Sequence, residues 1–314
     1  RLVPVTNWRG YCSRHNFAAG AADGGDYAVG GYIFEKMYGP DKENPDYKGG
    51  HPKKNALLYG FKAYKGYFIL GDYLVALGAG VTNLEPEQEG NIRTTLDQTA
   101  RTSPVYLLEK GRKKPLPMGV TTLDARQLKN AWIVQEGQFA YRALPDYQSD
   151  LYVACENRSA DWARMNEQNR QRKDLPAEVP VLRLWTHHGR TPVADTYGYA
   201  VYLGQGEPAR KLPFEVLRND TLVQAVRSAD RKVIGAVFYP EAPALEAKGL
   251  KLEVSAPCAL MLRETEEGCF VTVADACMDA SLKEIALKWN GRDIRIALPQ
   301  GMYSGKPVTV RIDR

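Results

Sequence analysis

The sequence lacks several features that would mark a membrane, disulfide-rich, zinc or nucleic-acid-binding protein. It contains no run of about 18 apolar residues and no recognisable signal peptide, so we expect no membrane-spanning helix. Its five cysteines are odd in number and none stands in a C-x-x-C pair, which argues against a disulfide framework and a zinc site. The net charge of +5 is weak and no basic stripe is present, so nucleic acid is not an expected partner.

The positions of the cysteines and carboxylates also do not indicate disulfide bonds or a metal site. Cys258, Cys269 and Cys277 lie in apolar, strand-like contexts, where we expect buried free thiols. A bond between one cysteine pair in an oxidising compartment stays open as the alternative. The turn at residues 23–26 offers two carboxylates, fewer than a calcium loop requires. We predict neither a metal site nor a cofactor.

What the sequence does contain is typical of a large, turn-rich β protein. The chain has 314 residues, of which 44% are apolar and 25% charged, with 28 glycines and 19 prolines. Strand-like segments recur every 8–12 residues or so, which favours sandwiches. A polar, glycine- and proline-containing stretch at residues 204–213 is the best linker candidate. We therefore predict an all-β fold with a large antiparallel sandwich over residues 1–210 and a smaller one over 213–314.

The clearest local pattern lies in residues 65–81, which are predicted to form two strands joined by a turn at Gly71 and Asp72. Separate strands are predicted for residues 56–64, 67–70 and 74–79. Residues 161–173 are polar with high helix propensity and predict a short surface helix or a long loop. Because the chain begins with Arg1 rather than Met, we expect that a leader or an upstream domain precedes it.

Taken in order, several of these segments resemble one known family. The run at 65–81, the Thr-Thr-x-Asp-Gln segment at 94–98, the Trp-x-x-x-Asn segment at 162–166 and the segment at 184–203 resemble polysaccharide lyase family 8. The resemblance covers roughly residues 56–314, and the spacings between its motifs resemble those of the chondroitin ABC branch. It implies a galactose-mutarotase-like super-sandwich followed by a C-terminal sandwich. It also implies cleavage of an acidic glycan, such as chondroitin sulfate or hyaluronan, by β-elimination at uronic acid outside the cytoplasm, in the periplasm or extracellular space.

The sequence departs from that family where the chemistry is concerned. The family's α/α-toroid domain, which carries its catalytic Asn, His and Tyr, has no counterpart in this sequence, because no long amphipathic helical series occurs. The family's W-D-W segment, expected between Tyr38 and Tyr59, is also not recognisable, and a loop is predicted at 41–54. We expect the toroid to lie upstream or on a separate chain, and to act with this chain on an acidic polysaccharide.

The sequence's own best polar cluster lies at residues 7–16. Its Trp8 is suited to stacking on a sugar face, while Arg14 and Asn16 are suited to binding a carboxylate or sulfate. The resemblance implies that Asn16 is the counterpart of a family site Asn, whereas the accompanying Glu is missing. Weak catalytic candidates are His15, Asn16 and Tyr11. The alternative is an N-terminal strand with ordinary polar surface residues.

Other polar and aromatic residues have a structural interpretation. His187 and His188 are adjacent on a predicted strand and should point to opposite faces, so we do not expect them to act together in one site. Tyr197, Tyr199 and Tyr202 are predicted to pack in the core or on a sheet face.

Three functional hypotheses follow, in order of preference. In the first, the chain is the β half of a lyase whose toroid lies elsewhere, and is inert alone. In the second, it is a stand-alone glycan-binding or scaffolding module. In the third, it is a complete enzyme that uses Tyr11, Arg14 and His15.

Overall fold

The structure is a computed structural model that describes residues 13, 15–35, 60–87, 90–124, 126, 128–144, 146–147, 150–159, 178–241 and 244–312. The predicted loop at 41–54 and the predicted helix or loop at 161–173 lie outside these residues. No helix in the described part of the chain has the length and apolar content that a membrane span requires. The described chain is almost entirely antiparallel β structure, which confirms the predicted fold class.

Backbone contacts divide the chain into two compact units, each of which gathers segments from distant parts of the sequence. The first unit comprises Arg1–Arg14, Phe34–Lys62 and Val81–Asp195, and the second comprises His15–Ile33, Ala63–Gly80 and Thr196–Arg314.

The first unit is built from two groups of antiparallel strands. One is a four-stranded sheet in the order β5 (Ile92–Ala100), β12 (Val179–Gly189), β11 (Asp150–Arg158), β8 (Gly119–Asp124). The other runs β10 (Ala140–Ala143), β9 (Ala131–Gln135), β6 (Val105–Glu109), β7 (Arg112–Pro115). Leu182 and Leu184 of β12 are fully buried, as expected when alternate residues of a strand face a core.

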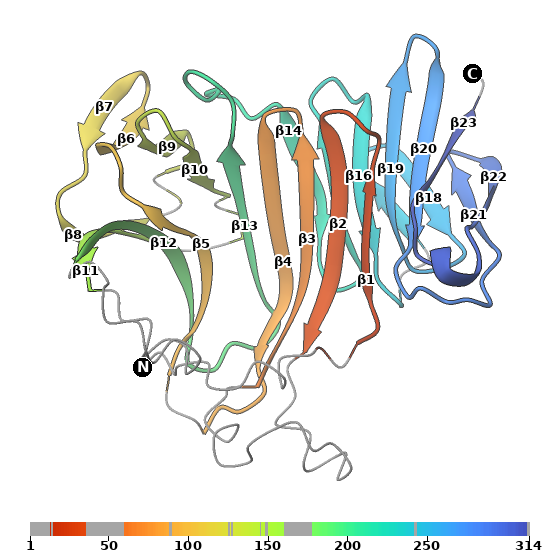
Figure 1. The fold of residues 1–314 in the computed structure, drawn as a ribbon, viewed down its shortest axis with the longest axis horizontal. Coiled ribbons are helices and arrows are strands. Elements are labelled where there is room, and N and C mark those ends of the chain that lie inside the picture. The colour runs from red at the N-terminus through yellow and green to blue at the C-terminus, as the bar shows by residue number, and fades with distance from the viewer. Residues whose placement is uncertain are drawn as a thin grey trace. The chain divides into compact units, whose positions relative to one another are not determined.

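The second unit has three layers of strands (Figure 1). The first layer runs β1 (Ala18–Ala22), β2 (Tyr27–Glu35), β3 (Phe61–Leu70), β4 (Tyr73–Asn83), β13 (Asp195–Tyr202), although parts of β2, β3 and β4 are assigned to the first unit. The second runs β14 (Phe214–Asn219), β15 (Val223–Ser228), β16 (Val233–Phe238), β19 (Cys258–Thr265), β20 (Gly268–Asp275), β23 (Val308–Ile312). The third runs β17 (Ala244–Ala247), β18 (Leu250–Val254), β21 (Glu284–Trp289), β22 (Arg292–Ala297), followed by the 3-10 turn η4 (Gly301–Tyr303).

Alternation along β16 explains how the middle layer contacts both of its neighbours. Ile234, Ala236 and Phe238 belong to the apolar core shared with the third layer. Val237 faces the other way: a Cβ atom at Gly31 of β2 would lie 2.7 Å from its Cγ1. Glycine at position 31 therefore allows β2 to approach the middle layer more closely than any side chain would permit.

The predicted turn at Gly71 and Asp72 is confirmed, but β3 is longer than predicted. Residues 61–64 and 67–70 form one continuous strand, so the predicted break at residues 65 and 66 is wrong. Gly66 is not a turn residue. A Cβ atom there would lie 2.6 Å from Oε1 of Gln224, so this glycine serves a close approach between two layers.

A buried chain of amide groups joins the first layer to the middle layer. Tyr239 donates its hydroxyl hydrogen to Oε1 of Gln224 at 2.6 Å, and Nε2 of Gln224 donates to Oδ1 of Asn219 at 2.9 Å. Asn219 in turn donates to the backbone carbonyls of Gly78 and Tyr197 at 3.2 and 3.1 Å. We call Tyr239, Gln224 and Asn219 the amide bridge. Nε2 of Gln224 also donates to the backbone carbonyl of Tyr64 at 3.3 Å. Because Gln224 is fully buried, its side chain depends on such protein partners for its hydrogen bonds.

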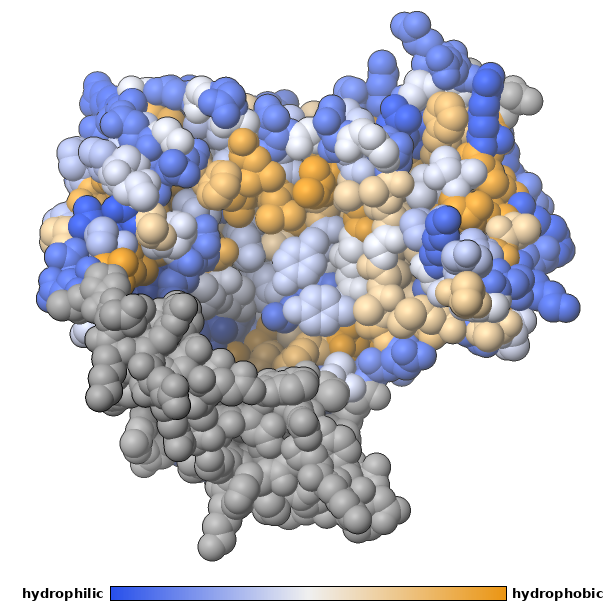
Figure 2. All heavy atoms as spheres, viewed as in Figure 1, coloured by the Kyte–Doolittle hydropathy of each residue, from blue (hydrophilic) through white to orange (hydrophobic). Residues whose placement is uncertain are grey.

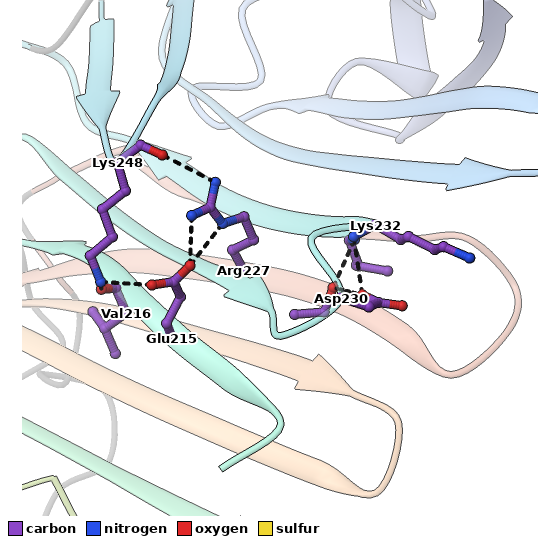
Figure 3. Close-up of polar contacts among 8 residues, drawn as sticks. Glu215, Val216, Arg227, Asp230, Lys232 and Lys248 are labelled. Atoms are coloured by element: carbon purple, nitrogen blue, oxygen red, sulfur yellow. Dashed lines mark hydrogen bonds and ion pairs between the residues drawn. The ribbon is translucent and has the colours of Figure 1, made fainter. Parts of the chain in front are cut away.

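An ion-pair cluster joins the middle and third layers of the second unit (Figure 3). Oε1 of Glu215 accepts hydrogen bonds from Nε and Nη2 of Arg227 at 3.0 and 2.6 Å, and Nζ of Lys248 donates to Oε2 at 2.8 Å. Hydrogen bonds from Lys248 and Arg227 lower the pKa of Glu215. Arg227 is only 5% exposed, so its charge needs this partner.

We expect Glu215→Gln to lower the free energy of unfolding at neutral pH by about 2 kcal/mol, a value reduced for the partial exposure of the carboxylate. A lowered folded pKa means that the stabilisation is present above the unfolded pKa and is lost as the pH falls through the folded pKa. The difference in melting temperature between variant and wild type should therefore shrink below about pH 4. Glu266→Gln, at an exposed turn, is the matched control. A difference that is equal at pH 7 and at low pH would contradict this account.

Candidate functional site

Four tyrosines lie on the face of the first layer that points away from the middle layer. Gly31 and Gly66 face the middle layer, so alternation places Tyr32 of β2 and Tyr67 of β3 on the opposite face. From β13, Tyr197 reaches across β4, where a Cβ atom at Gly78 would overlap its ring. Tyr199 follows two residues later on the same face. We call Tyr32, Tyr67, Tyr197 and Tyr199 the tyrosine row.

The rings of the tyrosine row are arranged in two stacked pairs. Tyr32 and Tyr67 have ring centroids 6.3 Å apart and planes inclined by 13°, and Tyr197 and Tyr199 have centroids 6.2 Å apart and planes inclined by 22°. Nζ of Lys65 lies 5.7 Å from the centre of the Tyr32 ring, a cation–π distance. Tyr32 and Tyr67 are half-buried, whereas Tyr197 and Tyr199 are buried.

The space-filling view shows the character of this surface. Weakly polar rings and apolar side chains gather over the middle of β3, β4 and β13, while strongly hydrophilic residues lie along the upper strand ends and hairpin tips (Figure 2). The half-buried rings of Tyr32 and Tyr67, with the ammonium group of Lys65 nearby, are suited to stacking on a sugar ring and to attracting an acidic substituent.

The protonation of the tyrosine row limits what it can do chemically. Burial raises the pKa of Tyr67, and the neighbouring phenols of Tyr32 and Tyr199 raise it further. Burial also raises the pKa of Tyr197 well above its usual value. These two phenols therefore stay protonated near neutral pH. They can donate hydrogen bonds, but they do not provide a general base.

The predicted site residues are only partly described. Trp8, Tyr11 and Arg14 lie outside the described residues. Asn16 is exposed and donates from Nδ2 to the carbonyl of Cys277 at 2.7 Å, beside a backbone bond from Ala18 to Ala276. Its amide therefore ties the start of β1 to the segment after β20.

His15 and Asn16 lie close to one end of the tyrosine row along the sheet. They immediately precede β1, whose first residue, Ala18, pairs directly with Tyr32 of β2. His15 is half-buried. Of the predicted polar cluster, His15 and Asn16 thus lie beside the tyrosine row at this edge of the sheet. Tyr32 and Tyr67 were missed by the sequence prediction, although each directly follows a glycine that faces the middle layer.

The two adjacent histidines have different partners, as strand alternation predicts. Nδ1 of His188 lies 2.6 Å from Oδ2 of Asp195, and its Nε2 lies 2.8 Å from Oγ1 of Thr94. Nε2 of His187 instead accepts a hydrogen bond from Nε1 of Trp185 at 3.0 Å. His188 therefore links Thr94 of β5 to Asp195, both within the first unit, and we assign it a structural role.

Neither metal ligation nor disulfide bonding has support in the described residues. No group of three or more His, Cys, Asp or Glu side chains among them is placed to hold a metal ion. The cysteines that the structure describes, Cys155, Cys258, Cys269 and Cys277, are free thiols, and Cys12 lies outside the described residues.

Comparison with known proteins identifies two family domains in order along the chain. The super-sandwich domain of polysaccharide lyase family 8 matches residues 5–211, and the C-terminal beta-sandwich domain of the same family matches residues 215–282.

Individual relatives show the same likeness. Chondroitinase-AC of Pedobacter heparinus is 25% identical over 320 residues, which cover 98% of this chain and 40% of the relative. Chondroitin sulfate ABC exolyase of Proteus vulgaris is 23% identical over 204 residues, which cover 64% of this chain and 19% of the relative. A chondroitinase AC lyase solved in enzyme–oligosaccharide complexes has a TM-score of 0.73 at 24% identity, covering 94% of this chain and 40% of that one. The chain thus spans about two fifths of the length of that chondroitinase.

Proposed function

Because this chain belongs to polysaccharide lyase family 8, we propose that it is the β-domain portion of an enzyme that cleaves acidic glycans by β-elimination at uronic acid. The observation that carries the proposal is the ordered match of both family domains along the chain. Chondroitin sulfate and hyaluronan are the proposed substrates, and the periplasm or the extracellular space is the proposed location. The proposed domain boundaries are 1–210 and 213–314.

The chemistry sets what the whole enzyme must provide. A base takes the proton from C5 of the uronate, the bond from C4 to the linking oxygen breaks, and a C4–C5 double bond forms while an acid protonates the departing oxygen. A donor to the uronate carboxylate makes the C5 proton more acidic. Tyr67 and Tyr197 have raised pKa values and do not suit the role of base. We therefore place the base and the acid on an α/α-toroid, upstream in the same protein or on a separate chain.

If the toroid carries the base and the acid, the surface around the tyrosine row is proposed to bind the polymer. Tyr32 and Tyr67 of the tyrosine row offer stacking surfaces and phenol donors, and Lys65 offers a positive charge. Trp8, Arg14 and Asn16 stay the proposed substrate-binding residues. His15, Asn16 and Tyr11 are the candidate catalytic residues for the alternative in which this chain carries a complete site.

A binding or scaffolding module derived from such a lyase is the second candidate. It is favoured by the raised pKa of the Tyr67 phenol, because a protonated phenol can hydrogen-bond to a sugar but does not remove a proton from it. The two candidates differ in whether an upstream toroid segment of the parent protein restores cleavage.

The test is to follow the ultraviolet absorbance of unsaturated uronate while the chain is incubated with chondroitin sulfate and with hyaluronan. We expect no rise for the chain alone and a rise when the upstream segment of the parent protein is added. Continued absence of product with the folded segment present would contradict the lyase proposal and favour the binding module. A rise from the chain alone, abolished by His15→Ala, would instead support a complete site on this chain.

A further inference from the structure

A second group of polar and aromatic side chains lies in the first unit, on the face of the sheet β5-β12-β11-β8 that points away from the buried leucines of β12. Figure 1 shows where these strands lie. On β12, Leu182, Leu184 and Thr186 are buried against the core. Alternation therefore places Arg183, Trp185 and His187 on the opposite face. Pairing brings two further residues to this face: Tyr152 of β11 lies opposite Trp185, and Arg93 of β5 lies opposite His187.

Trp185 is the centre of this group. The Tyr152 ring stacks beside it with centroids 5.5 Å apart and planes inclined by 15°. The guanidinium groups of Arg183 and Arg93 lie 5.1 and 5.6 Å from the centre of its ring. These contacts hold two flexible arginine side chains in defined positions before any ligand arrives, which reduces the entropy that binding must remove.

His187 completes the group as a neutral hydrogen-bond donor. Its ring lies edge-on to Tyr152, with centroids 4.5 Å apart, and its Nε2 accepts the indole hydrogen of Trp185 at 3.0 Å. Burial lowers the pKa of His187, and the positive charge of Arg93 lowers it further. The imidazole is therefore neutral near pH 7. Because Nε2 is an acceptor, the remaining proton is on Nδ1 and can be donated to a ligand oxygen.

The charges on this face are not balanced. Arg183 donates to both carboxylate oxygens of Glu156, at 2.9 and 3.0 Å, and Arg158 donates to the same carboxylate at 3.1 Å. Arg93 is exposed on the edge strand β5, and within the described ranges no carboxylate pairs with it. Two guanidinium groups thus share the Glu156 carboxylate, and Arg93 has no such partner among the described residues.

Two further carboxylates lie toward the β8 edge of this face. Asp150 of β11 and Asp124 of β8 are opposite each other, on the far side of β12 from Arg93. With strands about 4.8 Å apart, Asp150 is two strand spacings from Arg93, roughly 10 Å, and Asp124 is three, roughly 14 Å. The face is therefore positive at its β5 edge and acidic at its β8 edge.

We propose that Arg93, Tyr152, Arg183, Trp185 and His187, the arginine–tryptophan platform, form a binding site for a sulfated or carboxylated sugar unit of an acidic polysaccharide. Arg93 supplies the planar fork that pairs with a sulfate or carboxylate, and its stacking on Trp185 leaves the N–H edge available. The Nδ1 hydrogen of His187 and the hydroxyl of Tyr152 supply donors for sugar oxygens. The choice of polymer rests on the proposed function, whereas the recognition of an anionic sugar rests on this geometry.

The test measures binding, not cleavage. The full chain and its variants are titrated calorimetrically with a chondroitin sulfate hexasaccharide. We expect Arg93→Gln to raise the dissociation constant about tenfold, because it removes a guanidinium that has no carboxylate partner among the described residues of this face. Arg93→Lys keeps the charge but loses the fork, so it should recover only part of the affinity. The control, Arg112→Gln, removes an exposed charge from β7 in the same unit and should change binding less than about twofold.

Three results would overturn the proposal. The first is an unchanged dissociation constant for Arg93→Gln with its melting temperature intact. The second is an equal loss for Arg112→Gln, which would indicate attraction to net charge alone. The third is binding of a DNA duplex with the same dependence on Arg93, which would indicate a general polyanion surface. Failure of the proposed function has a separate sign, the absence of unsaturated product in the presence of the toroid segment, whatever Arg93 does.

Discussion

Replacing Gly78 with alanine is expected to lower the free energy of unfolding by roughly 3 kcal/mol, at the upper end of the usual cost of overfilling a packed site. The added Cβ atom would overlap the ring of Tyr197, which is only 2% exposed and cannot move into solvent. The ring or the β4 backbone must shift, and the carbonyl of Gly78 would then move relative to Asn219, to which it is hydrogen-bonded. Urea unfolding of the variant and wild type measures the change.

A double-mutant cycle identifies the cause. In a Tyr197→Ala background the ring is absent, so the additional cost of Gly78→Ala should fall below about 1 kcal/mol. Gly20→Ala is the matched control, because a Cβ atom at that strand glycine would make only an ordinary contact, 3.7 Å from the carbonyl oxygen of Val29. If Gly78→Ala were as mild as Gly20→Ala, the packing of Tyr197 across β4 would be wrong.

Replacing Gln224 with leucine is expected to cost about 3 kcal/mol, because it removes the centre of the amide bridge. The variant leaves the fully buried hydroxyl of Tyr239 and the part-buried Oδ1 of Asn219 without this partner, and it removes the donor to the carbonyl of Tyr64. Each such group costs on the order of 1–3 kcal/mol when its hydrogen bond is lost without access to water. Loss of this link should also loosen the first layer from the middle layer, since Asn219 binds the backbone of β4 and β13.

Equilibrium unfolding again provides the measurement, with Gln205→Leu at an exposed position as the control. Tyr239→Phe should destabilise the wild type by about 1–2 kcal/mol but add little to Gln224→Leu, because its hydrogen-bond partner is already gone. Additive effects of the two substitutions would argue that the amide bridge does not act as a connected network.

The sequence was sufficient to predict the fold class and the family because both depend on patterns along the chain. The alternation in β3 and β4 and the turn at Gly71 are local, and the ordered motifs extend over most of the sequence. The predicted break at Gly66 was wrong for a reason that is not local. No larger residue fits at position 66, because the side chain of Gln224, distant in sequence, lies against Gly66 in the fold.

The candidate surfaces were harder to predict for the same reason. Tyr32, Tyr67 and Tyr199 come from three strands whose pairing brings them together only in the folded sheet. Arg93 and Trp185 are likewise separated by most of the first unit's sequence, and their contact depends on the register of β5 against β12. A single sequence carries no direct signal for that register, because either face of a strand can bear polar residues.

Each of the two units contains a buried cysteine whose reactivity can report local unfolding of that unit. Cys155 lies in the first unit and Cys258 in the second, both buried, and burial raises the pKa of each. A thiol reagent requires an accessible thiolate, so neither cysteine reacts until its strand separates from its neighbours. The rates at which these two side chains become labelled therefore measure the local unfolding of the two units independently, in one sample and without an introduced dye.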